Sequence, residues 1–576
     1  MRTLLHRTLA AAALAALLAG PAAAAATITI INLDGVGEGF NDPTPVAPVG
    51  GNPGVTVGEQ RLNCFQQAAN IWGALLTSSV TIQVQAAFNP LSCTATSAVL
   101  GSAGPRFIEF NHPGAEFADY WYHEALACKQ AGVDLTPFGD PGLPPGDTGA
   151  DINAQFNSNL GNTGCLTGSG WYYGYDHNEG TKIDLLAVLL HEFGHGLGFS
   201  TVTSGSTGNY FNGPPALPAI FDRFLYDETT GLHWDENSAA QRQASAINTG
   251  NLTWDGEEVS YAAGTALSAA PELVVPFAPG LLEGNGAAFG PPITAGGLTA
   301  QALVVDDGVA ATLTSDACES PFVNAAALAG KIAVIDRGTC TFVIKVKNAQ
   351  INGAVGAIIV NNVAGQLSLG GSDPTITIPT IGITQADGAA LKTAISGGPT
   401  TVTMRLSPTR RAGMHPSGRV RMYSPNPFQS GSSVSHYDVS LSPNALMEPS
   451  INSDLTSSVD LTEALFKEIG WIPHTADVPG GPRTPRVALG SSPNPGRAGA
   501  LTVHFDLATE EQVEVALYDV TGRQVRSLAR GTYPAGRHDL AWDGRDDRGR
   551  AAAPGVYLAR LKGPRTSATL PVVLLD

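Results

Sequence analysis

The stretch Leu190-His191-Glu192-Phe193-Gly194-His195-Gly196-Leu197-Gly198 says more about fold and chemistry than any other part of this 576-residue chain. It contains the pattern HExxH, whose two histidines are four residues apart and therefore share one face of a helix. Both imidazoles can bind the same zinc ion, and the intervening Glu192 lies beside a metal-bound water as a general base. The spacing predicts a zinc-dependent hydrolase.

The residues around this pattern predict where the helix begins and ends. Thr181 and Asp184 have the spacing of a capping box, and the run that follows is apolar on almost every side. Gly196 and Gly198 come directly after the second histidine, where glycine commonly ends a helix. We therefore expect a buried helix, in which a pair of polar imidazoles needs a partner such as a metal ion.

The N-terminus has the three regions of a secretory signal peptide. Arg2 and Arg7 precede an Ala/Leu run, and small residues continue to Ala26. Elsewhere the chain lacks the roughly 20 consecutive apolar residues that a membrane-spanning helix needs. We expect a secreted protein without a transmembrane segment, either extracellular or at the cell surface.

The cysteines fit an oxidising compartment. Their number is even, and no two have the CxxC spacing of a metal site, so disulfides are favoured. Proximity in the sequence favours the pairs Cys64 with Cys93, Cys128 with Cys165, and Cys318 with Cys340.

Charge and composition limit the classes of function that this chain could have. The formal net charge is −18 with no basic stripe, which argues against nucleic acid as a partner. The 67 glycines and 40 prolines indicate much loop and β structure, and the length implies several domains.

Three segments outside the HExxH helix form the predicted scaffold of the first part. Residues 27–32 alternate like a strand, and residues 61–76 carry apolar side chains at helical spacing. Residues 151–157 predict another strand. If that strand is the edge of a sheet above the metal, it could pair with an extended substrate peptide.

The segment 267–406 differs in character from its flanks. It predicts strands at 331–335, 355–360 and 378–383, with helices at 342–352 and 385–395. The words GKIAVIDRGTCTF from Gly330, KVKNAQ from Lys345 and IPTI from Ile378 resemble the protease-associated (PA) domain. The resemblance implies a non-catalytic lid or interaction module, with a folded spacer as the alternative.

The C-terminal part predicts a linker at 475–486 and a β-sandwich at 487–576. The words YDVTGR from Tyr518, WDGRD from Trp542 and PGVY from Pro554 resemble immunoglobulin-like modules related to the flagellar hook-cap protein and to secretion-sorting tails. The resemblance implies attachment to a cell surface or to secretion machinery. The acidic loop after Trp542 is either a solvated turn or a calcium site.

A catalytic zinc needs a third protein ligand. HEFGHGLGFS resembles the start of the metzincin signature HExxHxxGxxH, but the position of the third histidine is occupied by Thr201. In leishmanolysin, a metzincin, the third histidine is displaced by an insertion and followed by a Leu-Met-x-Pro turn. His436, with Leu446-Met447-Glu448-Pro449 after it, matches that arrangement. The resemblance implies that His191, His195 and His436 bind Zn²⁺ and that Met447 is the Met-turn residue.

Alternative third ligands remain open. His177 and His415 are the substitutes among the other histidines, whereas His112, His123 and His233 fit hydrogen-bonded or surface roles. Asp222 or Asp227 would serve if the site resembled gluzincins or aspzincins.

These observations predict a multidomain α+β protein with a metzincin-like zinc protease core, an inserted α/β PA domain and a C-terminal β-sandwich. The expected division is signal peptide 1–26, catalytic domain 27–266, PA domain 267–406, second catalytic part 407–474, linker 475–486 and immunoglobulin-like module 487–576. The expected function is a secreted zinc metalloendopeptidase acting on protein or peptide substrates, with Glu192 as general base. The alternatives are a binding protein with an inactive or structural zinc site and an adhesin-like surface scaffold.

Overall fold

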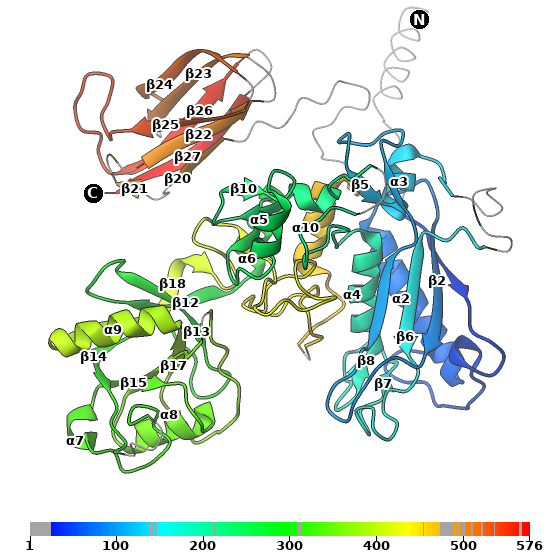
Figure 1. The fold of residues 1–576 in the computed structure, drawn as a ribbon, viewed down its shortest axis with the longest axis horizontal. Helices are drawn as coiled ribbons and strands as arrows, with labels where there is room; N and C mark the ends of the chain where they lie inside the picture. Colours follow the sequence, from blue (N-terminus) through cyan, green and yellow to red (C-terminus); the bar gives the residue numbers. More distant parts are fainter. Residues whose placement is uncertain are drawn as a thin grey trace, which may run out of the picture. The chain divides into compact units, whose positions relative to one another are not determined.

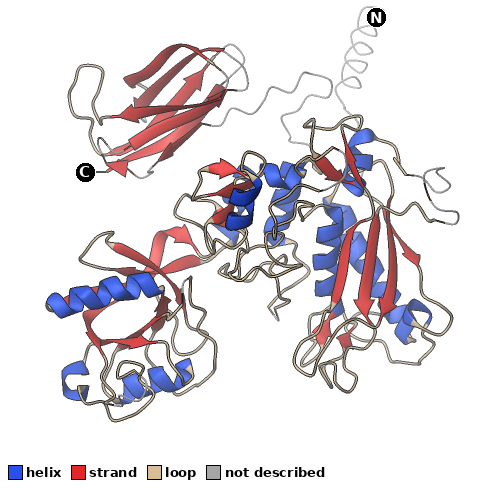
Figure 2. Ribbon diagram, viewed as in Figure 1, coloured by secondary structure: helices blue, strands red, loops and turns tan. Residues whose placement is uncertain are grey.

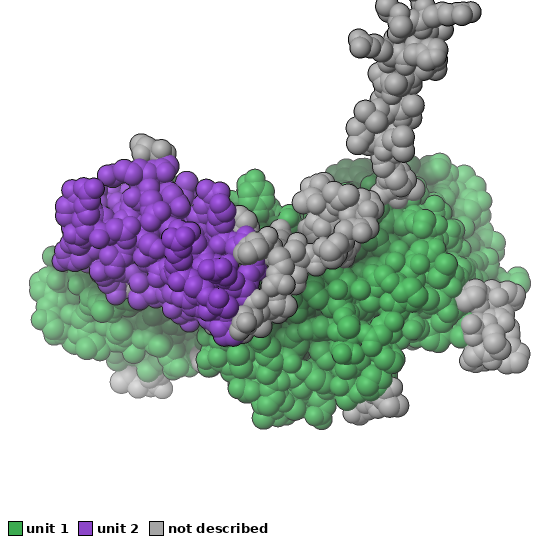
Figure 3. All heavy atoms as spheres, turned by 90° about the horizontal axis from the view of Figure 1, so that it is seen from above, with its two compact units in different colours: residues 1–472 green, residues 473–576 purple. Residues whose placement is uncertain are grey.

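The computed structural model describes residues 25–472, apart from 137–142, 144–146, 212–214, 309–312, 364 and 453, and residues 489–575, apart from 493–495, 498, 500, 508–510, 520–521, 535 and 564–566. Two compact units divide the chain after Ile472 (Figure 3). Nearly all of the expected signal peptide, residues 1–24, and the whole of the expected linker lie outside the described residues. Within the described part, no helix has both the length and the apolar content of a membrane span.

The first part of the chain is a sheet backed by two long helices (Figure 1). The strand order is β1-β2-β6-β3, with β1, β2 and β6 parallel and β3 antiparallel. The strands are β1 (Ile28–Asn32), β2 (Ile82–Asn89), β3 (Gly101–Pro105) and β6 (Ile152–Asn157), and the helices are α2 (Val57–Leu75) and α4 (Leu185–Leu197). Short pairs surround this layer: β4 (Ile108–Phe110) with β5 (Trp121–His123), and β7 (Trp171–Tyr172) with β8 (Ile183–Asp184). The helix α3 (Glu124–Ala131) follows β5 directly.

Both long helices begin at side-chain caps. In α2 the Thr56 hydroxyl accepts from the Glu59 amide and Glu59 bonds back to the cap, which places the start four residues before the predicted one. In α4 the predicted capping box at Thr181 is wrong. Asp184 itself is the N-cap, and its carboxylate accepts from the amides of Leu186 and Ala187.

Strand β6 lies inside the sheet, between β2 and β3, so the expectation that residues 151–157 form its edge is wrong. The antiparallel edge next to β6 is β3, whose sequence is GSAGP. This strand lacks the β-branched and aromatic residues that normally mark strands in a sequence, and its pairing with β6 supplies what local propensity does not.

A second sheet and three helices are formed by residues 225–266 and 420–469. The sheet order is β10-β9-β11-β19, so β19 returns to pair with β11 after about 165 intervening residues. The strands are β9 (Leu225–Asp227), β10 (Leu232–His233), β11 (Leu252–Trp254) and β19 (Val420–Arg421), and the helices are α5 (Ala239–Ser245), α6 (Glu257–Ala266) and α10 (Asp460–Ile469). The predicted capping box at Asp460 is also wrong: Val459 is the N-cap and makes no side-chain bond.

The segment between β11 and β19 contains a closed barrel with helices outside it (Figure 2). Strands β12 and β18 are antiparallel neighbours, with Ala269 opposite Arg411. The strands, in barrel order, are β12 (Ala269–Val274), β13 (Leu281–Gly286), β17 (Thr380–Ile383), β16 (Gly356–Val360), β15 (Ile332–Asp336), β14 (Leu298–Val304) and β18 (Thr400–Arg411). The helices are α7 (Ala325–Leu328), α8 (Phe342–Ile351) and α9 (Gln385–Gly397). Each strand and helix predicted between 331 and 395 is present, with ends that differ by at most two residues.

The second unit is a β-sandwich of a three-stranded and a five-stranded sheet. The first has the order β20-β22-β25 and the second β21-β27-β26-β23-β24. The strands are β20 (Leu489–Ser492), β21 (Gly496–Arg497), β22 (Leu501–Leu507), β23 (Glu511–Asp519), β24 (Gln524–Tyr533), β25 (Gly536–Trp542), β26 (Gly555–Lys562) and β27 (Ser567–Leu575). In the acidic loop, the Asp546 carboxylate accepts from the Arg548 and Arg550 amides, which is the bonding of a turn.

The disulfides correct two of the three predicted pairs. Cys93 bonds to Cys165 and Cys318 to Cys340, whereas Cys64 and Cys128 are buried thiols. The pairs Cys64 with Cys93 and Cys128 with Cys165 are therefore wrong, and Cys318 with Cys340 is right.

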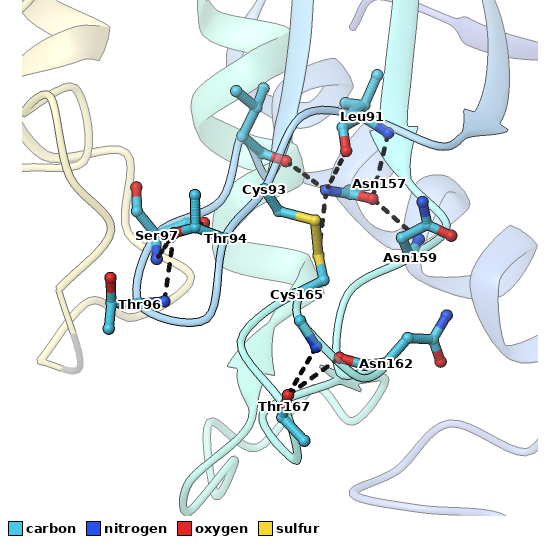
Figure 4. The surroundings of a disulfide bond; sticks show 12 residues. Leu91, Cys93, Thr94, Thr96, Ser97, Asn157, Asn159, Asn162, Cys165 and Thr167 are labelled. Carbon is cyan, nitrogen blue, oxygen red and sulfur yellow. Dashed lines mark hydrogen bonds between the residues drawn. A yellow bond between two sulfur atoms is a disulfide. The ribbon is translucent and has the colours of Figure 1, made fainter.

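The reason for the Cys93–Cys165 pair is the parallel alignment of β2 and β6. Asn89 lies opposite Asn157 at their carboxyl ends, so the two loops that follow emerge side by side. Figure 4 shows how Asn157 ties these loops: its side-chain amide donates to the Val99 carbonyl at 2.9 Å. Sequence distance is a poor guide to this pairing because the loops meet through the sheet.

Candidate metal centre

Three histidine rings from two distant parts of the chain converge on one point. The Nε2 atoms of His191 and His195 are 3.1 Å apart, those of His195 and His436 3.2 Å, and those of His436 and His191 3.3 Å. Helix α4 presents the first two rings on one face, and the loop that contains His436 brings the third. All three belong to the set that sequence analysis predicted as metal ligands.

Backbone carbonyls fix the orientation of each ring. The Nδ1 atoms donate to carbonyl oxygens, His191 to Leu446 at 2.7 Å, His195 to Phe199 at 2.8 Å and His436 to Ser432 at 2.7 Å. A carbonyl only accepts, so the proton sits on Nδ1 and the lone pair of each Nε2 faces the common centre. Hydrogen bonds of this kind to the other ring nitrogen fix the orientation of imidazoles that bind a metal.

The geometry fits a tetrahedral zinc ion. Nitrogens bound to such an ion at about 2.0–2.1 Å lie about 3.3 Å from one another. The three measured separations, from 3.1 to 3.3 Å, match this value. Three protein ligands also leave one coordination position for a water or a substrate, as in catalytic sites.

Burial keeps the rings neutral, which is the form that binds a metal. Burial lowers the pKa of His191 to about 4 and that of His436 to about 3, and it lowers the pKa of His195 well below the usual value. The bonds to the carbonyls act in the opposite direction but do not outweigh burial. Neutral Nε2 atoms are therefore available to a cation at neutral pH.

Glu192 lies on the same helix and is held by the sheet edge. The Ala103 amide of β3 donates to Glu192 Oε2 at 2.9 Å. Burial raises the pKa of Glu192 to about 7, and the Ala103 bond partly offsets this rise. Burial therefore makes this carboxylate a stronger proton acceptor than it would be in water.

A turn that contains Met447 packs against helix α4 near the histidine cluster. The Tyr437 amide donates to the Met447 carbonyl at 2.8 Å, which links this turn to the residue after His436. A Cβ atom at Gly194 would lie 2.7 Å from Met447 Sδ, so glycine in α4 lets the buried methionine pack directly against the helix. The structure thus places the Met447 side chain against α4 at Gly194, the residue before His195.

The alternative third ligands lie in other hydrogen-bonded networks. His177 Nδ1 bonds Asp184 at 2.6 Å, and His415 Nδ1 bonds Ser417 at 2.9 Å. Asp222 accepts from the hydroxyls of Thr201 and Thr203. Of the remaining candidates, Asp227 accepts from the Thr229 amide, His112 contacts Gln130, His123 contacts Ser200, and His233 contacts Asp255. Among the described residues, none of these side chains joins His191 and His195 in a metal-binding group.

The sequence did not predict two groups that position the side chains of the site. The Asp460 carboxylate accepts from the Leu446 amide at 2.5 Å and so holds the residue whose carbonyl orients His191. The Ala103 amide holds Glu192. A backbone amide has no sequence signature, and Asp460 had suggested only a helix cap.

Two regions of the chain match known domain families. Residues 300–391 match the PA domain, and residues 495–567 match the FlgD Ig-like domain. Both resemblances inferred from short sequence words are thereby confirmed.

Curated relatives match short portions only. The Minor extracellular protease Vpr of Bacillus subtilis (strain 168) is 36% identical over 86 residues, which is 15% of this chain and 10% of that protein. Leucine aminopeptidase 2 of Arthroderma otae is 47% identical over 79 residues, 13% of this chain and 16% of that protein. The chain therefore spans less than one fifth of either relative.

Solved structures give partial likenesses. An aminopeptidase from Aneurinibacillus sp. strain AM-1 is 23% identical, covers 33% of this chain and 41% of its own, and has a TM-score of 0.19. FlgD from P. aeruginosa is 27% identical, covers 12% of this chain and 60% of its own, and has a TM-score of 0.11. The two family matches show that the chain is a multidomain α+β protein that contains a PA domain and a C-terminal FlgD Ig-like domain.

Proposed function

We propose that this chain is a secreted zinc-dependent metalloendopeptidase similar to leishmanolysin, with zinc held by His191, His195 and His436. The observation that carries the proposal is the convergence of three neutral Nε2 atoms at separations of 3.1 to 3.3 Å. The glutamate of HExxH beside them favours catalysis, because a purely structural zinc site is closed by four protein ligands and has no use for a base.

In the proposed mechanism Glu192 moves the proton. A zinc ion held by His191, His195 and His436 would supply Lewis acidity toward the attacking water and the scissile carbonyl. Glu192 accepts the proton of the attacking water at its carboxylate and later returns it to the leaving amine. The Ala103 amide fixes Oε2, so that this transfer takes place from a constant position.

The edge strand β3 is the proposed docking site for the substrate backbone. It ends the sheet, and its Ala103 amide already points away from β6 toward Glu192. An extended peptide that added to this edge would pass the histidine cluster with its carbonyls held by backbone bonds. Such binding engages residues on both sides of the cleaved bond, which favours an endopeptidase.

The alternative is a binding protein whose zinc site is inactive. One observation favours the binding protein: the histidine cluster lies outside both the PA domain and the FlgD Ig-like domain. It predicts bound zinc without cleavage of any peptide.

The test is zinc content measured beside casein cleavage for the wild type and His436→Ala, with His415→Ala as the matched control. We expect one zinc at this centre and cleavage in the wild type and the control, and loss of both in His436→Ala. Zinc and cleavage that survive in His436→Ala would overturn the ligand set, and zinc without cleavage in the wild type would favour the binding protein. A peptide blocked at both ends separates endopeptidase from aminopeptidase activity, since only an endopeptidase cleaves it.

A further inference from the structure

A second cluster of potential ligands lies at the start of α3. Glu124 and Cys128 are four residues apart on this helix and share a face, and Asp151 lies directly before β6. One ligand atom from each residue lies within 4.8 Å of the other two. The exposed fractions are 0% for Glu124, 2% for Cys128 and 4% for Asp151, so the cluster is closed to solvent.

The side chain of Glu124 has no hydrogen-bond partner within the described part of the chain. Both of its carboxyl oxygens are buried and unpaired, whereas its neighbours are partly satisfied. Asp151 Oδ2 accepts from the Gln83 amide at 2.7 Å, and Cys128 Sγ accepts from the Leu135 amide at 3.3 Å. An unpaired buried carboxyl group costs free energy, so this side chain points to a ligand that the protein atoms do not supply.

The local charge favours a cation. Burial, together with the neighbouring carboxylates, raises the pKa of Glu124 to about 9, and burial raises that of Asp151 to about 6. Arg106, whose charge lowers the pKa of Glu124, is already paired with Asp147 at 2.6 Å. Without a cation the cluster must keep protons on its acids, and a divalent ion would replace them.

We propose that Glu124, Cys128 and Asp151 bind a second divalent metal ion, of the zinc class, in a buried site with three protein ligands. Calcium and magnesium prefer oxygen ligands alone, whereas a thiolate beside two carboxylates suits a borderline-soft ion such as zinc. Burial raises the pKa of Cys128, the Leu135 amide that donates to Sγ acts in the opposite direction, and a bound cation would add to the effect of that amide. The cluster shares no residue with the histidine centre. A bound ion would tie α3 to the start of β6.

The test uses cobalt(II) reconstitution of the full chain, because a thiolate bound to cobalt gives a charge-transfer absorption that histidine ligands alone do not. We expect two equivalents of cobalt and this absorption in the wild type. Cys128→Ala should lose the absorption and one equivalent. Cys64→Ala, which removes the other buried thiol, should keep both, and His436→Ala should keep the absorption while losing the other equivalent.

The proposal is overturned if the folded wild type shows no thiolate absorption, or if the absorption survives in Cys128→Ala. Should Cys128→Ala fail to fold, Glu124→Gln keeps the shape of the side chain and removes its charge. We expect Glu124→Gln to bind one equivalent less, whereas an unchanged stoichiometry would mean that Glu124 is merely a buried neutral acid. The readout does not involve proteolysis, so this result is independent of the proposed enzyme activity.

Discussion

His191 Nδ1 donates a 2.7 Å hydrogen bond to the carbonyl oxygen of Leu446, which lies 255 positions further along the chain. The bond orients the first ring of the histidine cluster through the turn that also contains Met447. The first histidine and the Met447 turn are therefore one structural unit, although the whole barrel segment separates them in the sequence.

Replacing Glu192 by Gln should separate metal binding from catalysis. The amide has nearly the shape of the carboxyl group but cannot accept a proton, so we expect zinc content to be unchanged. Casein cleavage should fall by about 10²–10⁴-fold, the usual contribution of general acid–base catalysis. Cleavage at the wild-type rate with zinc retained would remove Glu192 from the mechanism.

Met447 should contribute stability through its contact with α4. It is fully buried, and Met447→Ala would leave a cavity beside Gly194. We expect a loss of about 2–5 kcal/mol in the free energy of unfolding, measured by denaturant titration. Met447→Leu conserves the volume and should cost less than about 1.5 kcal/mol. Equal losses in both variants would show that the sulfur, not packing, matters at this position.

His233 should make stability depend on alkaline pH. Burial alone would lower its pKa, but hydrogen bonds to Asp255 and Glu236 outweigh burial and raise the pKa to about 9. Because the unfolded pKa is about 6.5, the charged ring stabilises the fold fully below pH 6.5, and this contribution is lost as the pH rises through about 9.

The variant His233→Gln tests this dependence. At pH 6 it should be less stable than the wild type by about 1 kcal/mol, a value reduced for partial exposure, and the difference should shrink by pH 10. Urea midpoints at the two pH values give the comparison. A difference that stays constant with pH would exclude the ion pair as its source.

The Cys93–Cys165 disulfide should stabilise the two loops that follow β2 and β6. Its two ends are 72 residues apart, so breaking it frees a long loop in the unfolded chain. Cys93→Ala with Cys165→Ala should lower the free energy of unfolding by about 2–4 kcal/mol. Peptide mapping of the wild type without reduction should recover this pair, and recovery of a Cys64–Cys93 peptide instead would contradict the pairing.

The sequence predicts an element of the fold well where a motif or a periodicity within that element specifies it. The HExxH helix and the barrel elements between 331 and 395 were predictable because each has its own periodicity or motif. The third histidine was found through a family resemblance, since nothing in the local sequence of His436 distinguishes it from His415 or His177.

The features that the sequence could not predict arise from tertiary pairing. Strand β3, GSAGP, lacks an alternating pattern and exists because it pairs with β6. The Cys93–Cys165 bond depends on two parallel strands that end side by side. The amide of Ala103 contacts Glu192 only after that sheet has formed.

The pairing of β12 with β18 bears on how the chain is synthesised and folded. Ala269 and Arg411 lie opposite each other, so the barrel segment enters and leaves at neighbouring points. The 141 residues between them form one connection in the rest of the first unit. Once the barrel has folded, the two ends of this connection are already close together, so closing it costs only the small entropy of a short loop. An order of assembly follows: a barrel that folds first as the chain emerges brings His436 within reach of His195, and no complete histidine cluster exists before that step.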